Sequence, residues 1–323
     1  MSKGVLRSCT PAIAAALTLL AGFCVSCADN SAGSGESGME HSASQAPATQ
    51  KTKKPEVSAK KLVYAHEHER QHGFLVTPKK PQPGKKLPLV VFLHGGGWQE
   101  KSTAQSAAPA VNDLVEHGAA VWNVEYRGVS IDGEDAPGGW PMTYQDVAAA
   151  IDFIPQLANH SDVPLDLNNV VVAGYSAGGN LATWTCSRPE LAPDAPGAHP
   201  AFPVDKCVGI AGVYDMELAY QQHDKFVRTL LGGTPQEVPA HYFDASPAYN
   251  VNKKARVLVL HGENDEMVNV DEVTRFADYA KQRGLNIDAI IFDDAKHLSW
   301  ANPAGLQWQQ ARRTILEQVG IKS

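Results

Sequence analysis

The sequence predicts an α/β domain with a mostly parallel sheet that is covered by helices on both faces. From residue 62 onward, apolar strand-like runs alternate with helix-like segments, which is the pattern of α/β proteins. Several runs are apolar on both faces, as expected for parallel strands buried between two helical layers. The chain has 323 residues, of which 43% are hydrophobic, so it can form a large core.

The elements follow in order along the chain. An antiparallel pair is expected at one edge, within 62–77, and the apolar run 87–93 predicts the first buried strand. Helical spacing, with Val147, Ile151 and Ile154 on one face, predicts a helix over 144–157. Further strands are expected at 119–124, 169–173, 207–212, 256–260 and 287–292, and further helices at 109–116, 271–283 and 306–319. The stretch 215–249 is longer than a simple crossover, and we expect it to form a small cap over the carboxyl ends of the strands.

The first residues predict a secretory signal rather than part of the fold. Lys3 and Arg7 precede an apolar segment over 12–25, and small residues follow. Cleavage after residue 28 gives a signal peptide over 1–28. A second route is a lipoprotein signal cleaved before Cys27, which would leave a lipid tether to a membrane. Both routes predict an exported protein, which is periplasmic, secreted or anchored to a membrane.

The residues after the signal have the composition of a linker. The stretch 29–60 is rich in Ser, Gly, Ala, Lys and Pro and lacks aromatic residues, so it cannot bury enough surface to become ordered. The folded α/β domain is therefore expected over 61–323. The net charge of −7 and the absence of a strong basic run give no sign of a nucleic-acid partner.

Two cysteines remain after processing, Cys186 and Cys207. In an exported protein they could form one disulfide. The alternative is two small buried apolar residues.

A candidate nucleophile lies between a strand and a helix. Ser176 stands in the motif Gly-Tyr-Ser-Ala-Gly over 174–178, directly after an apolar run and before a helix-like one. Strand, sharp turn, serine and helix is the context that gives this motif its meaning.

A serine hydroxyl needs a base, and the base needs an acid that orients it. Asp265 follows the strand 256–260, and His297 follows the strand 287–292. The chain order serine, acid, histidine, each after a strand, predicts a Ser176–His297–Asp265 triad.

A glycine loop supplies the second half of the predicted site. His94-Gly95-Gly96-Gly97 follows the first buried strand. We expect oxyanion donors from the backbone of Gly96, Gly97 and Ala177, because fixed N–H groups stabilise the charge that develops in acyl transfer.

These motifs together resemble the α/β-hydrolase esterases and lipases of the HGGG type. The resemblance covers most of the chain after residue 60, and it is closest to the branch of bacterial feruloyl/acetyl esterase-like and kynurenine formamidase-like enzymes. Glu125 is a departure, since that branch usually has asparagine before the Tyr126-Arg127 pair. The further stretches that carry the resemblance are Gly212-Val213-Tyr214-Asp215, Ala245-Ser246-Pro247 and Gly262-Glu263-Asn264-Asp265.

The resemblance implies a twisted sheet of about eight strands and a serine hydrolase that cleaves small carboxylic esters. No cofactor or metal is expected, and the oligomeric state is left open. Trp98, Tyr175 and Trp300 are candidates for the substrate pocket, with core packing as the alternative for the two tryptophans. Two other functions compete: an arylformamidase-type amide hydrolase, and a non-catalytic binding protein of the same fold.

Overall fold

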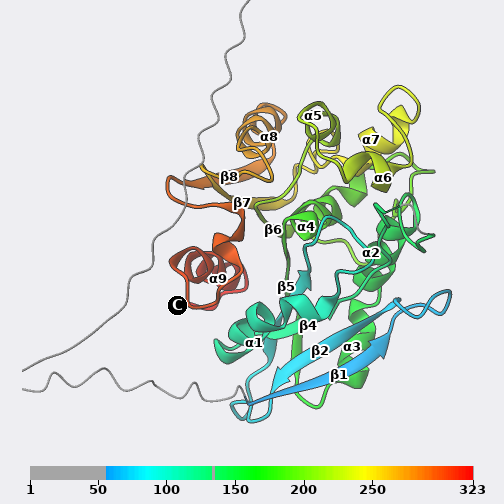
Figure 1. Ribbon diagram of the computed structural model, residues 1–323. Coiled ribbons are helices and arrows are strands. Elements are labelled where there is room, and N and C mark those ends of the chain that lie inside the picture. Colours follow the sequence, from blue (N-terminus) through cyan, green and yellow to red (C-terminus); the bar gives the residue numbers. More distant parts are fainter. Residues whose placement is uncertain (1–55, 133–134, 323) are drawn as a thin grey trace, which may run out of the picture. The chain divides into compact units, whose positions relative to one another are not determined.

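One eight-stranded sheet forms the centre of the fold (Figure 1). The computed structural model describes residues 56–132 and 135–322. The strands lie in the order β1-β2-β4-β3-β5-β6-β7-β8, and only β1–β2 and β2–β4 pair antiparallel. The strands are β1 (Val57–Val63), β2 (His72–Pro78), β3 (Leu87–Leu93), β4 (Ala120–Val124), β5 (Leu165–Tyr175), β6 (Lys206–Ile210), β7 (Arg256–Gly262) and β8 (Asn286–Phe292). The predicted α/β fold class is confirmed.

Helices cover both faces of the sheet because its central strands are apolar on both sides. All seven residues of β3 are buried. Val90 and Phe92 belong to a core cluster with α1 and α9, whereas Leu89 and Val91 belong to a cluster with α2, α3, α4 and α8. The helices are α1 (Ala108–Glu116), α2 (Met142–Asp152), α3 (Ile154–His160), α4 (Ala177–Ser187), α5 (Met216–Gln221), α6 (Val227–Leu231), α7 (Pro239–Ala245), α8 (Asp271–Gln282) and α9 (Leu306–Gln318).

Two of the predicted boundaries that are wrong have a simple physical cause. The helix expected over 144–157 is divided into α2 and α3, because Pro155 has no N–H to donate to the preceding turn and instead occupies the first turn of a new helix. The linker expected over 29–60 ends too late, because β1 begins at Val57. Lys60 and Lys61 give this stretch the composition of a linker, but β1 lies at the edge of the sheet, where charged side chains are common.

Several N-terminal predictions fall outside the described residues. These are the signal over 1–28, the lipidated Cys27 and the linker up to residue 55. Within 56–132 and 135–322, no helix combines the length and the hydropathy needed to cross a membrane.

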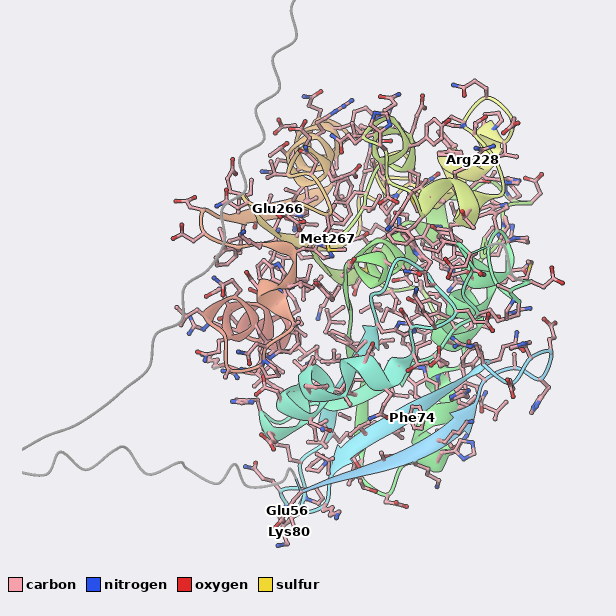
Figure 2. All side chains as sticks on the ribbon, viewed as in Figure 1. Glu56, Phe74, Lys80, Arg228, Glu266 and Met267 are labelled. Carbon is pink, nitrogen blue, oxygen red and sulfur yellow. A yellow bond between two sulfur atoms is a disulfide. The ribbon has the colours of Figure 1, made fainter. Side chains whose placement is uncertain are left out.

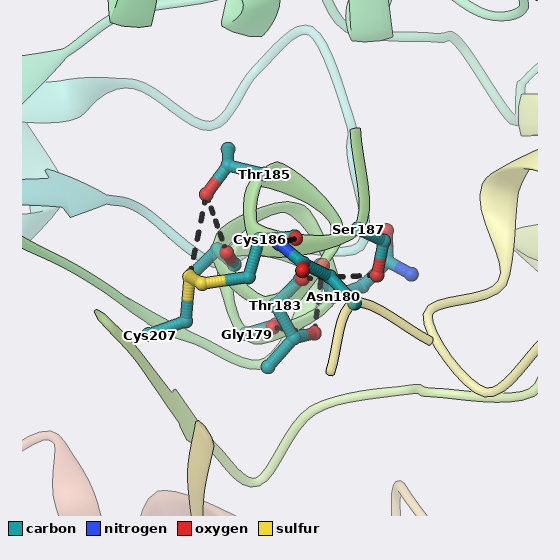
Figure 3. Close-up of a disulfide and its surroundings, with 9 residues drawn as sticks. Gly179, Asn180, Thr183, Thr185, Cys186, Ser187 and Cys207 are labelled. Atoms are coloured by element: carbon teal, nitrogen blue, oxygen red, sulfur yellow. Dashed lines mark hydrogen bonds between the residues drawn. A yellow bond between two sulfur atoms is a disulfide. The ribbon is translucent and has the colours of Figure 1, made fainter. Parts of the chain in front are cut away.

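A disulfide joins Cys186 in α4 to Cys207 in β6 (Figure 3). Both residues are buried, and the Thr185 hydroxyl lies 3.5 Å from Cys207 Sγ. The bridge therefore ties the helix that follows Ser176 to the neighbouring strand of the sheet.

Removing this disulfide is expected to destabilise the fold by about 3 kcal/mol, because the bridge closes a loop of 21 residues in the unfolded chain. Urea unfolding of a Cys186→Ala/Cys207→Ala double variant measures this loss. A reducing agent should destabilise the parent protein by a similar amount and leave the double variant unchanged. Equal stability of the parent and the double variant would contradict the prediction.

Candidate active site

Ser176 occupies a sharp turn between β5 and α4. Its backbone has φ 56° and ψ −122°, a region that costs a non-glycine residue on the order of 1–3 kcal/mol. The turn is fixed by a hydrogen bond from the N–H of Ser176 to the carbonyl of Ile210 in β6, at 2.8 Å. The surrounding sheet thus holds the serine in a conformation that it would not adopt on its own.

The two glycines that flank the turn permit a close approach between backbones. A Cβ atom on Gly174 would overlap the carbonyl of Gly178, and one on Gly178 would overlap the carbonyl of Leu93 in β3. Neither glycine has a positive φ. Close packing of β5, α4 and β3, rather than an unusual torsion, therefore requires glycine at both positions.

The structure brings Ser176, His297 and Asp265 together from three strand ends. Asp265 lies in the loop after β7, and His297 begins the short helix η3 (His297–Trp300) after β8. The Nε2 atom of His297 lies 2.9 Å from Ser176 Oγ, and its Nδ1 atom lies 2.7 Å from Asp265 Oδ2. Both distances are those of hydrogen bonds, so the three side chains form a continuous chain.

Asp265 is placed to remain a carboxylate. Burial raises its pKa, but hydrogen bonds from His297 and from the N–H groups of Val268 and Met267 outweigh burial, and the pKa lies below its usual range. The two backbone groups both donate to Oδ1 at 2.9 Å. Oδ2 is therefore left for the imidazole of His297.

Tyr175 holds the histidine from the other side. Its hydroxyl donates to the carbonyl of His297 at 2.7 Å, and the two rings lie 5.2 Å apart. This contact links the residue before Ser176 to the backbone of the histidine.

The glycine loop after β3 lies beside the serine. Gly96 and Gly97 have φ values of 111° and 62°, in the region that glycine adopts most readily. A Cβ atom on Gly96 would overlap the Ser102 hydroxyl, and one on Gly97 would lie 3.0 Å from the Phe226 ring. Within the described part of the chain, the N–H groups of Gly96, Gly97 and Ala177 have no hydrogen-bond acceptor. These donors are available to a ligand.

A buried polar cluster braces the start of this loop. The His94 ring stacks on Tyr126 at 4.2 Å, and the Tyr126 hydroxyl donates to the His94 carbonyl at 2.7 Å. Glu125 accepts from the N–H of Ala104 at 2.8 Å and pairs with Arg70 at 3.0 Å. Its Oε1 atom also lies 3.4 Å from His94 Nε2.

Glu125 replaces the asparagine that the resemblance led us to expect. Burial raises its pKa, but the contacts with His94, Ala104 and Arg70 outweigh burial and leave the pKa below its usual range. An ionised Glu125 is therefore compensated by its neighbours. The substitution alters the brace behind the loop and does not touch Ser176, His297 or Asp265.

A cavity of about 210 Å³, here called the Ser176 pocket, opens in front of the serine. Trp98 and Tyr175 line it, as predicted, but Trp300 does not. Trp300 lines a neighbouring cavity because its ring packs edge-on against Phe292 of β8, at 5.3 Å. The Ser176 pocket is lined by Gly96, Gly97, Trp98, Gln99, Tyr175, Ser176, Ala177, Val213, Asp224, Phe226, Met267, Val268, His297 and Leu298.

Two residues from the predicted cap line the Ser176 pocket. The stretch 215–249 forms the short helices α5, α6 and α7, and the loop before α6 contributes Asp224 and Phe226. A lone carboxylate in a loop, such as Asp224, gives no sequence signal of its own. Only their position in the fold brings them to the site.

Glu272 is a second buried carboxyl near the site. Its Oε2 atom accepts from the N–H groups of Tyr214 and Asp215, at 2.8 and 2.9 Å. The residue is only 1% exposed, and burial raises its pKa to about 8. Glu272 therefore remains protonated in the folded protein at pH values where an exposed glutamate is ionised.

This raised pKa predicts a loss of stability with rising pH. The folded state holds the proton of Glu272 more tightly than the unfolded state does. The stability that this protonated group contributes is therefore complete below about pH 4.5 and is lost as the pH rises through 8. Each pKa unit corresponds to about 1.4 kcal/mol. Thermal unfolding at pH 5, 7 and 9 should show Glu272→Gln gaining stability relative to the parent as the pH rises. Parallel curves for the two proteins would refute this.

A serine on a strand-to-helix turn, with an acid and a histidine after later strands of a mostly parallel sheet, defines an α/β-hydrolase. The chain belongs to the BD-FAE family, whose sequence profile matches residues 76–279.

Known proteins with related sequences and structures agree with this assignment. Esterase LipC of Mycobacterium tuberculosis is 31% identical over 210 residues, which cover 62% of this chain and 50% of LipC. The chain spans about half the length of this and two further curated relatives, LipM and LipQ of the same organism.

Among solved structures, a truncated carbohydrate esterase from gut microbiota has a TM-score of 0.66 at 20% identity. The match covers 82% of this chain and 96% of that one. A bacterial heroin esterase has a TM-score of 0.65 at 22% identity, covering 83% and 86%. At these identities the likeness shows the shared fold.

Proposed function

We propose that this protein is a serine hydrolase that cleaves carboxylic esters through an acyl-enzyme intermediate. The observation that carries the proposal is the chain of contacts from Ser176 Oγ through His297 to Asp265, at 2.9 and 2.7 Å. Similarity to relatives such as the esterase LipC supports an ester as the substrate.

In the first half of the reaction, Ser176 Oγ attacks the carbonyl carbon while its proton moves to Nε2 of His297. Asp265 stabilises the imidazolium that forms and keeps the other proton on Nδ1. The carbonyl oxygen becomes negative and faces the free N–H groups of Gly96, Gly97 and Ala177. Ala177 is the first residue of α4, so the helix dipole also favours this charge.

In the second half, the bond to the alcohol breaks, and the alcohol oxygen takes the proton from Nε2 of His297. The acyl group is then bound to Ser176 as an ester. Water enters, gives its proton to His297 and attacks the acyl carbon, and the same N–H groups hold the second negative oxygen. Release of the acid returns the proton to Ser176.

We also propose that the enzyme acts outside the cytoplasm, either released or tethered through Cys27. The signal pattern over 1–28 supports export. The disulfide between Cys186 and Cys207 supports an oxidising compartment.

The experiment that tests the function combines labelling with a substrate series. Purified protein is incubated with a fluorophosphonate probe, and the modified peptide is identified by mass spectrometry. Labelling of Ser176, together with hydrolysis of p-nitrophenyl acetate, is the expected result. The absence of both would favour a non-catalytic binding protein. Faster cleavage of N-formylkynurenine than of any ester from acetate to octanoate, or of a feruloyl ester, would favour the amide hydrolase.

A further inference from the structure

A second cavity opens beside the Ser176 pocket and shares a wall with it. This cavity, here called the acidic pocket, has a volume of about 480 Å³. Val213, Asp224, Met267 and Val268 line both cavities. In Figure 2, Glu266 and Met267 of its rim lie together on the loop after β7. A substrate that reaches Ser176 can therefore extend from one cavity into the other.

The two cavities differ in charge. Apart from Asp224 and His297, the Ser176 pocket is lined by residues without a charge. Asp224, Asp265, Glu266 and Glu272 line the acidic pocket, and no lysine or arginine of the described chain does. Glu272 is protonated, Asp265 is paired with His297 and Glu266 with Lys296, so Asp224 is the carboxylate of the four that is left without an ion pair. The electrostatic potential in such a cavity favours a cation and disfavours an anion.

Glu272 provides a separate sign that the acidic pocket receives a polar ligand. Its Oε2 atom is occupied by two backbone N–H groups, but its Oε1 atom is buried without a hydrogen-bond partner. Buried polar atoms are rarely left unpaired. A polar group or a water that enters with the substrate would complete this site.

Asp224 is the carboxylate at the junction of the two pockets. Its Oδ1 atom accepts from the N–H groups of Phe226 and Val227, at 2.7 and 3.3 Å, and so fixes the turn that leads into α6. Its Oδ2 atom has no hydrogen-bond partner within the described residues, and the residue is half-buried. One oxygen is therefore structural and the other is available to a ligand.

Neither of the neighbouring lysines lines the acidic pocket. Lys225 extends over the ring of Phe226, with Nζ 5.1 Å from the ring centroid. Lys296 pairs with Glu266 at 3.3 Å. The negative charge of Asp224 is thus not cancelled by a direct ion pair.

We propose that the alcohol part of the ester carries a cationic group, such as a quaternary ammonium, that binds beside Asp224 at the mouth of the acidic pocket. The proposal rests on the esterase function proposed above. The alcohol oxygen takes its proton from His297, and the acidic pocket is bounded by the loop 265–269 that orients His297. The group that extends past the histidine is therefore the alcohol, whereas the carbonyl oxygen faces the glycine loop.

The test uses two acetate esters of the same shape. Acetylcholine carries a quaternary nitrogen where 3,3-dimethylbutyl acetate carries a carbon atom. At pH 7.5, kcat/KM for acetylcholine should exceed that for the neutral ester. Asp224→Asn should lower this ratio about fivefold to tenfold, which is the range expected for one charge near the protein surface. The side-chain oxygen of asparagine accepts backbone hydrogen bonds in a turn as that of aspartate does, so the variant removes the charge and keeps the turn before α6.

A matched variant controls for net charge. Glu116→Gln removes one negative charge at the end of α1. This end of the helix leads to the start of β4, so it lies at the opposite end of the parallel strands from Ser176. This variant should leave both rates unchanged. Choline should also inhibit p-nitrophenyl acetate hydrolysis by the parent enzyme more strongly than 3,3-dimethylbutanol does, a comparison that needs no variant.

The outcomes separate the two proposals. A parent enzyme that prefers the neutral ester, an unchanged ratio in Asp224→Asn, or equal inhibition by the two alcohols overturns the cation site and leaves the esterase standing. Failure to cleave either ester or p-nitrophenyl acetate overturns both.

Discussion

Replacing Ser176 with alanine is expected to lower kcat for p-nitrophenyl acetate about a millionfold. The variant has no oxygen to form the acyl-enzyme, and the remaining groups cannot replace a missing nucleophile. The serine hydroxyl contacts only His297 among the described side chains, so the fold should be retained. The measurement compares steady-state turnover of the two purified proteins, with thermal unfolding as the check on folding.

The control is a serine outside the site. The Ser161 hydroxyl donates to the carbonyl of Val163, just before β5. The Ser161→Ala variant should turn over substrate as fast as the parent and should still be labelled by the fluorophosphonate probe. Ser176→Ala should lose the labelling completely. Turnover by pure Ser176→Ala within a hundredfold of the parent would show that Ser176 is not the nucleophile.

The central strands could be predicted from the sequence because burial on both faces leaves long apolar runs. The strand expected at 87–93 matches β3 completely, and the one at 287–292 differs from β8 by one residue. The start of β5 differs from the expectation, since residues 165–168 are partly polar and only Leu165 and Asp166 pair with β3, before a shift of register after Pro88. A local pattern cannot reveal such a pairing, which depends on a distant strand.

The group of Ser176, His297 and Asp265 could also be predicted, because the fold places the ends of parallel strands at one edge of the sheet. Chain order alone therefore brings Asp265 and His297 close to the serine. Asp224 and the pairing of Glu125 with His94 could not be predicted in this way. Each depends on the path of a loop, and neither leaves a periodic or spaced pattern in the sequence.

Trp300 shows the limit of an argument from sequence distance. It lies three residues after His297, yet its ring packs on Phe292 and faces the neighbouring cavity. Trp98 lies one residue after the glycine loop and does line the Ser176 pocket. Residues that are close in sequence lie close in space, whereas the direction of each side chain is set by the backbone and by packing.

Replacing Asp265 with asparagine is expected to lower kcat about 10⁴-fold, and the structure gives the reason. The N–H groups of Met267 and Val268 both donate to Oδ1, so they will hold the amide oxygen of an asparagine at that position. Its NH₂ group then takes the place of Oδ2 and donates to Nδ1 of His297. The imidazole must carry its proton on Nε2, where it can no longer accept the proton of Ser176.

This outcome is distinguished from a general loss of charge by Asp294→Asn, which removes an exposed carboxylate from the loop before His297 and should leave kcat within about twofold. The Asp265 variant should bind substrate with a similar KM, because Asp265 lies behind the histidine and acts on proton transfer rather than on binding.

A normal kcat in Asp265→Asn would mean that His297 is held in its reactive form by another group. His261, whose Nε2 atom lies 3.5 Å from Asp265 Oδ2, would be the first to test. A fall in kcat with an unchanged KM in Asp265→Asn, and not in Asp294→Asn, therefore identifies Asp265 as the carboxylate that orients His297.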